Sequence, residues 1–405
     1  MIPIAQPSIG PEEAEAASRA ILSGWLSQGP QVAAFESEFA ALVGAPHACA
    51  VSNCTTALHL ALLAVGVGPG DEVVTVSHSF VATANAIRQC GAVPVFVDIE
   101  EEGFNIDPTG IAEAITPRTR AILCVHQIGM PCDLPAILAI ARAHGIAVVE
   151  DAACAIGSEI LIEGSWERIG RAHGDVVCFS FHPRKVITTG EGGMLTTRDP
   201  AFDRLFRLWR QHGMSVSDVQ RHQSRSVIFE DYPVTGFNYR MTDIQAAIGR
   251  EQIKRLGSIV SRRRALAEAY GAMLRGIPGT RAPTEPRWAR SNWQSYCVGL
   301  DPEIDAPLVM QRMLEQGVAT RRGVMCAHLE KAHADLPRRP LPRSETARDH
   351  SIQLPIFPQM TGDMQARVVE ALAEAIRAQI GTRPVAGEAL PVVQARPEAM
   401  LSPPG

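Results

Sequence analysis

The sequence predicts an α/β fold, with a mostly parallel central sheet flanked by helices and a smaller C-terminal α+β domain. From Asp71 onward, short apolar runs alternate with helix-like segments, a pattern typical of parallel strands joined by helices. The runs are apolar at successive positions, as expected for strands covered on both faces. The expected strands span residues 73–76, 93–97, 121–125 and 146–150, and the expected helices span 81–90, 107–114 and 134–144.

The composition is that of a folded chain long enough for two domains. Hydrophobic residues make up 46% of the 405 residues and charged residues 20%, which excludes global disorder. The net charge is −5 and the one short basic run is 262–264, so we expect no nucleic-acid partner.

Cysteine and histidine usage argues against disulfides and against a metal site. The nine cysteines are dispersed without a C-x-x-C pair, which is typical of reduced thiols in a cytoplasm. The histidines show no ligand spacing, so we expect no metal. Because no signal peptide or membrane-length apolar run is present, we expect a cytoplasmic protein with no membrane partner.

The N-terminal region offers a helix start suited to phosphate. Residues 11–43 are predicted to be helical, with a loop at 23–30. A further helix is predicted from about Thr55 to Val65, with Ser52 and Asn53 able to cap it. Thr55 and Thr56 add hydroxyls to the free backbone N–H groups of the first turn, which favours phosphate binding; an ordinary well-capped helix is the alternative.

Three polar or aromatic residues follow the ends of expected strands, where ligands bind in parallel sheets. They are Phe80, Gln127 and Asp151. Asp151 follows a buried apolar run, where a carboxylate needs a cation or hydrogen-bond donors. It is interpreted either as a helix cap or as a carboxylate that binds a protonated ring nitrogen. A Rossmann dinucleotide site is not expected, because the nearest glycine cluster precedes a strand.

The stretch from Gly174 to Thr197 is the candidate centre of the chemistry. An apolar strand-like run, 176–181, leads to Lys185, and a glycine-rich return precedes a second strand-like run, 194–197. Burial at such a place disfavours the ammonium, so the lysine can act as a nucleophile toward a carbonyl. A surface lysine in a hairpin turn is the alternative.

The remaining chain predicts a second domain and a tail. A helix starting at Thr242 or Asp243 continues past Gly257 as a connector. Other helices are expected at 200–212, 306–316 and 365–379, and a strand at 295–300. The expected domains are 1–256 (the large domain with an N-terminal arm), 257–380 (the small domain) and 381–405 (a proline-rich disordered tail).

Taken together, eight stretches in order resemble the DegT/DnrJ/EryC1/StrS family of sugar aminotransferases. These are enzymes of the aspartate-aminotransferase fold, type I, that depend on pyridoxal 5′-phosphate (PLP). The resemblance extends to about residue 380. The stretches are SGWLSQGP, SNCTTALHLAL, SHSFVATANAI, PVFVDI, EDAACA, FSFHPRKVITTGEGGM, GFNYRMTDIQAAIG and LPIFP.

The resemblance implies a role for each candidate site residue. Lys185 would form the Schiff base with PLP and move the proton during transfer. Asp151 would pair with the pyridinium nitrogen, so that the ring can accept electrons. Thr55, Thr56 and Ser180 would bind the phosphate, Phe80 would stack on the ring, and Asn238 would reach the phosphate of the partner subunit, which implies a homodimer with shared sites.

Cys154 is the main departure from the family pattern. The family usually has glutamine or histidine there, in contact with the phenolic oxygen of the cofactor, and a thiol is a weaker donor. Retention of Lys185 argues against the family's dehydratase branch, in which histidine replaces the lysine.

The resemblance implies an aminotransferase of amino-sugar biosynthesis. Glutamate or glutamine would donate the amine, leaving the cofactor as pyridoxamine 5′-phosphate, and a keto sugar, nucleotide-linked by expectation, would accept it. The alternatives are a dehydratase or cyclase of the same fold, similar to the aminohydroxybenzoate synthases, and a PLP-binding regulatory protein without turnover.

Overall fold

The structure is a computed structural model of the whole chain. It describes residues 1–216, 221, 222, 224–337 and 339–380. The expected tail, 381–405, lies outside the described residues.

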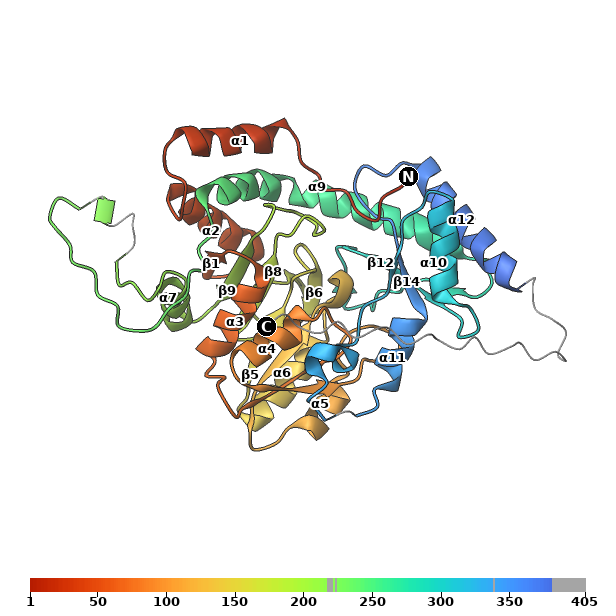
Figure 1. Cartoon of the computed structure of the whole chain (residues 1–405), viewed down its shortest axis with the longest axis horizontal. Coiled ribbons are helices and arrows are strands. Elements are labelled where there is room, and N and C mark those ends of the chain that lie inside the picture. The colour runs from red at the N-terminus through yellow and green to blue at the C-terminus, as the bar shows by residue number, and fades with distance from the viewer. Residues whose placement is uncertain (217–220, 223, 338, 381–405) are drawn as a thin grey trace, which may run out of the picture.

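A seven-stranded sheet forms the centre of the N-terminal part (Figure 1). Five strands run parallel to their neighbours, whereas β9 pairs antiparallel with both β8 and β1. The expected α/β class with a mostly parallel sheet is therefore confirmed. In spatial order the strands are β1 (His47–Val51), β9 (Gly193–Thr197), β8 (Val176–Ser180), β5 (Ala147–Asp151), β4 (Thr119–Val125), β2 (Glu72–Val76) and β3 (Val93–Val97).

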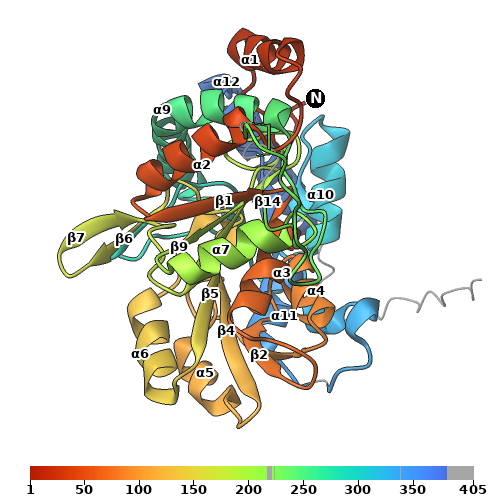
Figure 2. The ribbon, with the colours of Figure 1, turned by 90° about the vertical axis from the view of Figure 1, so that its left-hand side faces the viewer.

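Helices cover both faces of this sheet, and Figure 2 shows α5 and α6 on the side opposite α3 and α4. One apolar core lies between the strands and α3, α4 and α7, and another between the strands and α2, α5, α6 and the first half of α9. Helix α1 packs along α9. The bounds are α1 (Pro11–Leu22), α2 (Pro30–Val43), α3 (Cys54–Ala64), α4 (Ala82–Gln89), α5 (Pro108–Ala114), α6 (Leu134–His144), α7 (Pro200–Trp209) and α9 (Asp243–Leu274).

Helix starts in this region follow from capping side chains. Asn53 accepts a hydrogen bond from the backbone N–H of Thr56 at α3, and Asp133 accepts one from Ala136 at α6. Thr242 caps α9 in the same way. Each of these elements starts within a residue or two of the predicted position.

A third apolar core forms around the C-terminal residues. An antiparallel sheet of four strands packs there against α10, α12 and the second half of α9. The expected boundary between residues 256 and 257 falls inside α9, and the domain limits stay a prediction. The elements are β10 (Thr280–Arg281), β12 (Tyr296–Leu300), β14 (Ser351–Leu354), β13 (Arg321–Arg322), α10 (Ala306–Glu315), α11 (Pro342–Asp349) and α12 (Gly362–Ile380).

A small antiparallel sheet of three strands, absent from the expected elements, lies at the side of the large sheet. It consists of β6 (Glu159–Ile162), β7 (Ser165–Arg168) and β11 (Ala289–Arg290), so it joins a hairpin after β5 to the segment that precedes β12. Among the described residues, no helix combines the length and apolar character needed to cross a membrane.

Candidate active site

A cavity of about 670 Å³ opens at the carboxyl edge of the parallel strands. Because β2, β4, β5 and β8 run in the same direction, the residues that follow their last positions meet at this edge. Residues 321–325 and 353–354 of the C-terminal region complete the wall. Seven of the eight predicted site residues line the cavity: Thr55, Thr56, Phe80, Asp151, Cys154, Ser180 and Lys185.

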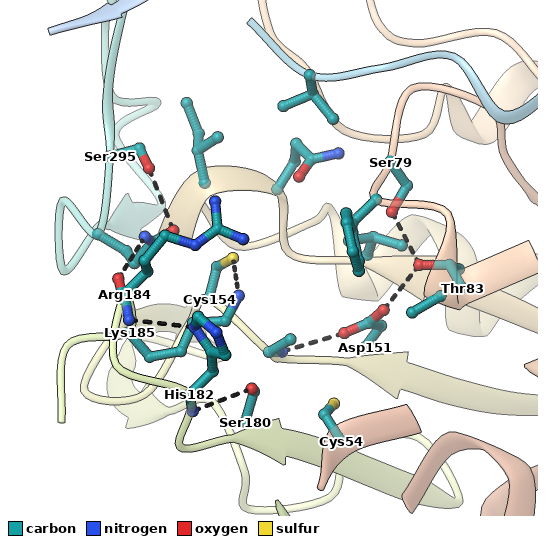
Figure 3. A pocket seen from close by; sticks show the side chains of 18 of the residues that line it. Cys54, Ser79, Thr83, Asp151, Cys154, Ser180, His182, Arg184, Lys185 and Ser295 are labelled. Atoms are coloured by element: carbon teal, nitrogen blue, oxygen red, sulfur yellow. Dashed lines mark hydrogen bonds between the residues drawn. The ribbon is translucent and has the colours of Figure 1, made fainter. Parts of the chain in front are cut away.

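Lys185 lies in the loop that follows β8, and its amine is directed at Cys154 (Figure 3). The nitrogen Nζ is 3.1 Å from the sulfur Sγ. Both side chains are half-buried and line the same cavity, so the amine is accessible to a ligand. The loop does join the antiparallel strands β8 and β9, as in the alternative of a hairpin lysine, but the side chain of Lys185 is half-buried and lines the cavity.

The protonation of Lys185 differs from the sequence-based expectation. Burial acts to lower the pKa of the amine, as expected, but Cys154, Cys54 and Asp151 outweigh burial and raise the pKa above its ordinary value. The free amine is therefore an ammonium at neutral pH. It must lose a proton before it can attack a carbonyl.

Asp151 is the last residue of β5, and its carboxylate is buried beneath the cavity. Its Oδ1 accepts a hydrogen bond from the backbone N–H of Ala153 at 3.1 Å, and its Oδ2 accepts one from the Thr83 hydroxyl at 2.9 Å. Burial raises the pKa of Asp151, although both donors and Lys185 oppose the rise. A buried carboxylate with few charged partners is suited to a cationic ligand atom.

The start of α3 provides the backbone N–H groups of a helix N-terminus at one end of the cavity. Thr56 donates its hydroxyl to the Asn53 carbonyl at 2.7 Å, which fixes the first turn. Ser180, the last residue of β8, also lines this part. The strand β9 lies close to the same turn, because a Cβ at Gly193 would come within 2.4 Å of the Asn53 carbonyl oxygen.

Phe80 lies in the turn between β2 and α4 and is 60% exposed although it lines the cavity. A large aromatic ring left accessible inside a cavity is available to stack on a planar ligand.

Asn238 is the one predicted residue that does not line the cavity of its own chain. Its side chain is exposed, and its backbone forms an isolated bridge with Gln211. The neighbouring Tyr239 does line the cavity and contacts His59 through its hydroxyl at 3.1 Å.

Several lining residues were not singled out by the sequence analysis. Arg321 and Arg322 form the two-residue strand β13, which pairs with β14. Because so short a strand has no period to detect, no sequence signal marks these arginines. Arg184 stands directly before Lys185, and only that adjacency could have indicated it. Further lining residues of this kind include Ser79, Thr83, His182 and Tyr239.

The residues of the cavity fit pyridoxal phosphate. An accessible lysine suits its aldehyde, a helix N-terminus suits its phosphate and a buried carboxylate suits its ring nitrogen. These three groups and the Phe80 ring line one cavity of sufficient volume.

Comparison with known proteins agrees with this assignment. A profile of the DegT/DnrJ/EryC1/StrS aminotransferase family matches residues 7–373. The spore coat polysaccharide biosynthesis protein SpsC of Bacillus subtilis (strain 168) is 38% identical over 384 residues, which cover 93% of this chain and 97% of SpsC.

Solved structures of similar sequence share the fold. DesV of S. venezuelae, in complex with a ketimine intermediate, has a TM-score of 0.83 at 34% identity, covering 92% of this chain and 98% of DesV. DesI, in the presence of its TDP-sugar product, has a TM-score of 0.83 at 31% identity, covering 93% of each chain. The chain therefore belongs to the DegT/DnrJ/EryC1/StrS aminotransferase family, and it is a transaminase that uses pyridoxal 5′-phosphate.

Proposed function

We propose that the protein transfers an amino group from glutamate or glutamine to a nucleotide-linked keto sugar, within the biosynthesis of an antibiotic or a surface polysaccharide. The names of two relatives support this substrate class: SpsC is a protein of polysaccharide biosynthesis, and DesI was solved with a TDP-sugar product.

The charge of the cavity wall is the observation that best supports an anionic substrate. Arg184, Arg321 and Arg322 line the cavity together with Lys185, whereas the acidic lining residues are Asp151 and Glu191. This excess of cations occurs in a chain whose net charge is −5. A positive cavity wall attracts the carboxylates of an amino donor and the diphosphate of a nucleotide sugar.

Different residues of the chain have different roles in the transfer. When bound, pyridoxal phosphate supplies an electron sink for the carbon that loses its proton. Lys185 holds the cofactor covalently and moves that proton. Asp151 stays ionised against the ring nitrogen, and Phe80 packs on the ring face. The first turn of α3 and Ser180 hold the phosphate.

A homodimer with shared sites belongs to the same proposal, with Asn238 acting on the phosphate of the partner subunit. Its support is twofold: Asn238 is exposed and lies outside its own cavity, and apolar side chains are exposed in the same segment. Val227 is 84% exposed, Phe229 91% and Tyr232 55%, which is unusual for a surface that no other chain covers.

Two half-reactions test the proposed function. Glutamate or glutamine added to the PLP-loaded enzyme should convert the cofactor absorbance to that of pyridoxamine phosphate. A panel of nucleotide-linked keto sugars should then restore the original spectrum, and the same sugars without the nucleotide should restore it more slowly. A dehydratase or a non-catalytic binding protein would leave the cofactor unconverted by either amino donor, which would refute the proposal.

A further inference from the structure

Three buried side chains in the wall of the cavity are joined by consecutive hydrogen bonds (Figure 3). The hydroxyl of Ser79 lies 2.8 Å from that of Thr83, which lies 2.9 Å from Oδ2 of Asp151. Ser79 and Thr83 are each 2% exposed, and Asp151 is 4% exposed. The hydrogen bonds are thus shielded from water. A hydrogen bond to a charged group is stronger in such a buried environment than in water.

The number of hydroxyl protons determines which group donates in each of these two hydrogen bonds. An ionised carboxylate only accepts hydrogen bonds, so Thr83 must donate its single hydroxyl proton to Asp151. The Thr83 oxygen can then only accept from Ser79, which must donate in turn. Both donors therefore point toward the carboxylate, and the arrangement favours the charged form of Asp151 over the neutral form.

We propose that Thr83, oriented by Ser79, is a positioning residue that keeps Asp151 ionised and directed at the ring nitrogen of the cofactor. The proposal rests on the proposed role of Asp151 in pairing with that nitrogen. Burial alone drives the carboxylate toward its neutral form, and the backbone N–H of Ala153 satisfies only Oδ1. Thr83 provides the donor for the other oxygen.

The same turn serves the cofactor in a second way. Ser79 and Thr83 are four residues apart at the start of α4, and Phe80 lies between them with its ring exposed in the cavity. The hydroxyl pair closes this turn. The same turn thus positions Phe80 to stack on the cofactor ring and orients the donor that keeps Asp151 charged opposite the ring nitrogen.

Binding of two cofactor analogues separates this role from simple packing. The full-length protein, freed of its cofactor, is titrated by fluorescence with pyridoxamine 5′-phosphate and with its 1-deaza analogue, in which carbon replaces the ring nitrogen. Neither ligand forms a covalent bond with Lys185. For Thr83→Val we expect the affinity for pyridoxamine phosphate to fall by about tenfold or more, since a donor to a charged group is lost. Affinity for the 1-deaza analogue should change by less than about twofold, because that analogue has no proton to share with Asp151.

Control variants complete the test. Thr83→Ser keeps the hydroxyl and should restore the affinity for pyridoxamine phosphate, whereas Ser79→Ala should show the same selective loss in weaker form. Equal losses for both analogues in Thr83→Val would mean that Thr83 only packs the turn, and no loss for either would mean that it does not act on Asp151. Asp151→Asn should itself remove the preference for the natural ring. If it does not, the assigned role of Asp151 fails, and the role of Thr83 fails with it.

Discussion

The amine of Lys185 and the thiol of Cys154 lie 3.1 Å apart, so the thiol is the first polar group that the free amine meets. Burial lowers the pKa of Lys185, but Cys154 is the largest of the influences that raise it. The thiol therefore favours the ammonium form, which cannot attack an aldehyde.

Replacing Cys154 should accelerate the loading of the cofactor. In the cofactor-free protein, Cys154→Ala should lower the pKa of Lys185 and enlarge the fraction of neutral amine at pH 7 to 8. The profile of PLP capture against pH should then shift to lower pH by about half a unit to one unit, since one hydrogen bond contributes about 1 kcal/mol. Stopped-flow absorbance measures the rate, and Cys154→Ser serves as the control that keeps a polar neighbour. Superimposable profiles for the wild type and Cys154→Ala would contradict this account.

Lys185→Ala should fold and bind PLP without turnover, because the other contacts to the cofactor remain. Borohydride reduction followed by peptide mapping should locate the cofactor on Lys185 in the wild type and on no residue in the variant. A reduced cofactor found on another lysine of the wild type would disprove the assignment.

Hybrid dimers should recover activity lost in each parent. Asn238 lies outside the cavity of its own chain, so Lys185→Ala and Asn238→Ala would damage different sites of a hybrid. Mixing the two inactive proteins under conditions that exchange subunits should restore some turnover, up to about one intact site per hybrid. Proven exchange without recovered activity would count against shared sites.

The arginines of the wall should act selectively on charged substrates. Arg321→Gln should raise KM for a nucleotide-linked keto sugar by about tenfold, since a contact to phosphate is lost, and should change KM for the free sugar little. The loss should also reduce the dependence of KM on ionic strength. Arg281→Gln, on β10 and outside this cavity, is the matched control. An equal change in KM for both sugars would show that Arg321 does not contact the phosphate.

Glu36 should matter for stability rather than for chemistry. Its buried carboxylate pairs with Arg207 at 2.7 Å and with the buried Arg210, and it accepts a hydrogen bond from the backbone N–H of Ala50. Glu36→Gln leaves Arg210 without its counter-charge, which should cost about 3 kcal/mol in the free energy of unfolding at pH 7. Urea denaturation measures this loss.

The pH dependence of that loss has a definite sign. Burial acts to raise the pKa of Glu36, but Arg210 and Arg207 hold it below its ordinary value of 4.5. The carboxylate thus contributes stability above about pH 4.5 and loses the contribution as the pH falls through the folded-state pKa. The difference between wild type and variant should therefore narrow in acid. Glu38→Gln, in a half-exposed pair with Arg250, should cost less than about 1 kcal/mol. A loss of similar size in both variants would contradict the role given to burial.

Periodicity and capping predicted most of the sheet and its helices, because these signals are local. The strand that ends at Asp151 was expected within one residue of its position, and the loop after β8 brought Lys185 to the expected edge. Such local signals do not predict contacts between segments that are distant in the sequence. The strand β13 forms only because β14, about 30 residues later, pairs with it, and the Cys154 contact that raises the pKa of Lys185 depends on how two loops meet.

The contact proposed for Asn238 could not be predicted from local sequence patterns, for a different reason. Its proposed target belongs to another subunit, so no pattern within the sequence places it. The Thr83 hydroxyl was missed because a threonine near a helix start is ordinarily a local cap. Only the spatial arrangement shows it donating to a strand residue 68 positions away.

Helix α9 packs into a core of the large sheet with its first half and into the C-terminal core with its second half. Its 32 residues make a rod of about 48 Å, and its first residue, Asp243, accepts hydrogen bonds from the backbone N–H groups of Gly29, Gln31 and Val32 at the start of α2. Figure 1 shows the rod running from the large sheet to the C-terminal sheet without a break. Any rotation of the C-terminal sheet over the cavity must therefore flex this rod, since it contains no loop that could serve as a hinge. The stiffness of this helix would then oppose such a rotation, together with the hydrogen bonds that Asp98 accepts from Arg343 and Ser344. Substitution of Gly257, exposed at mid-length, would alter that stiffness without touching the site.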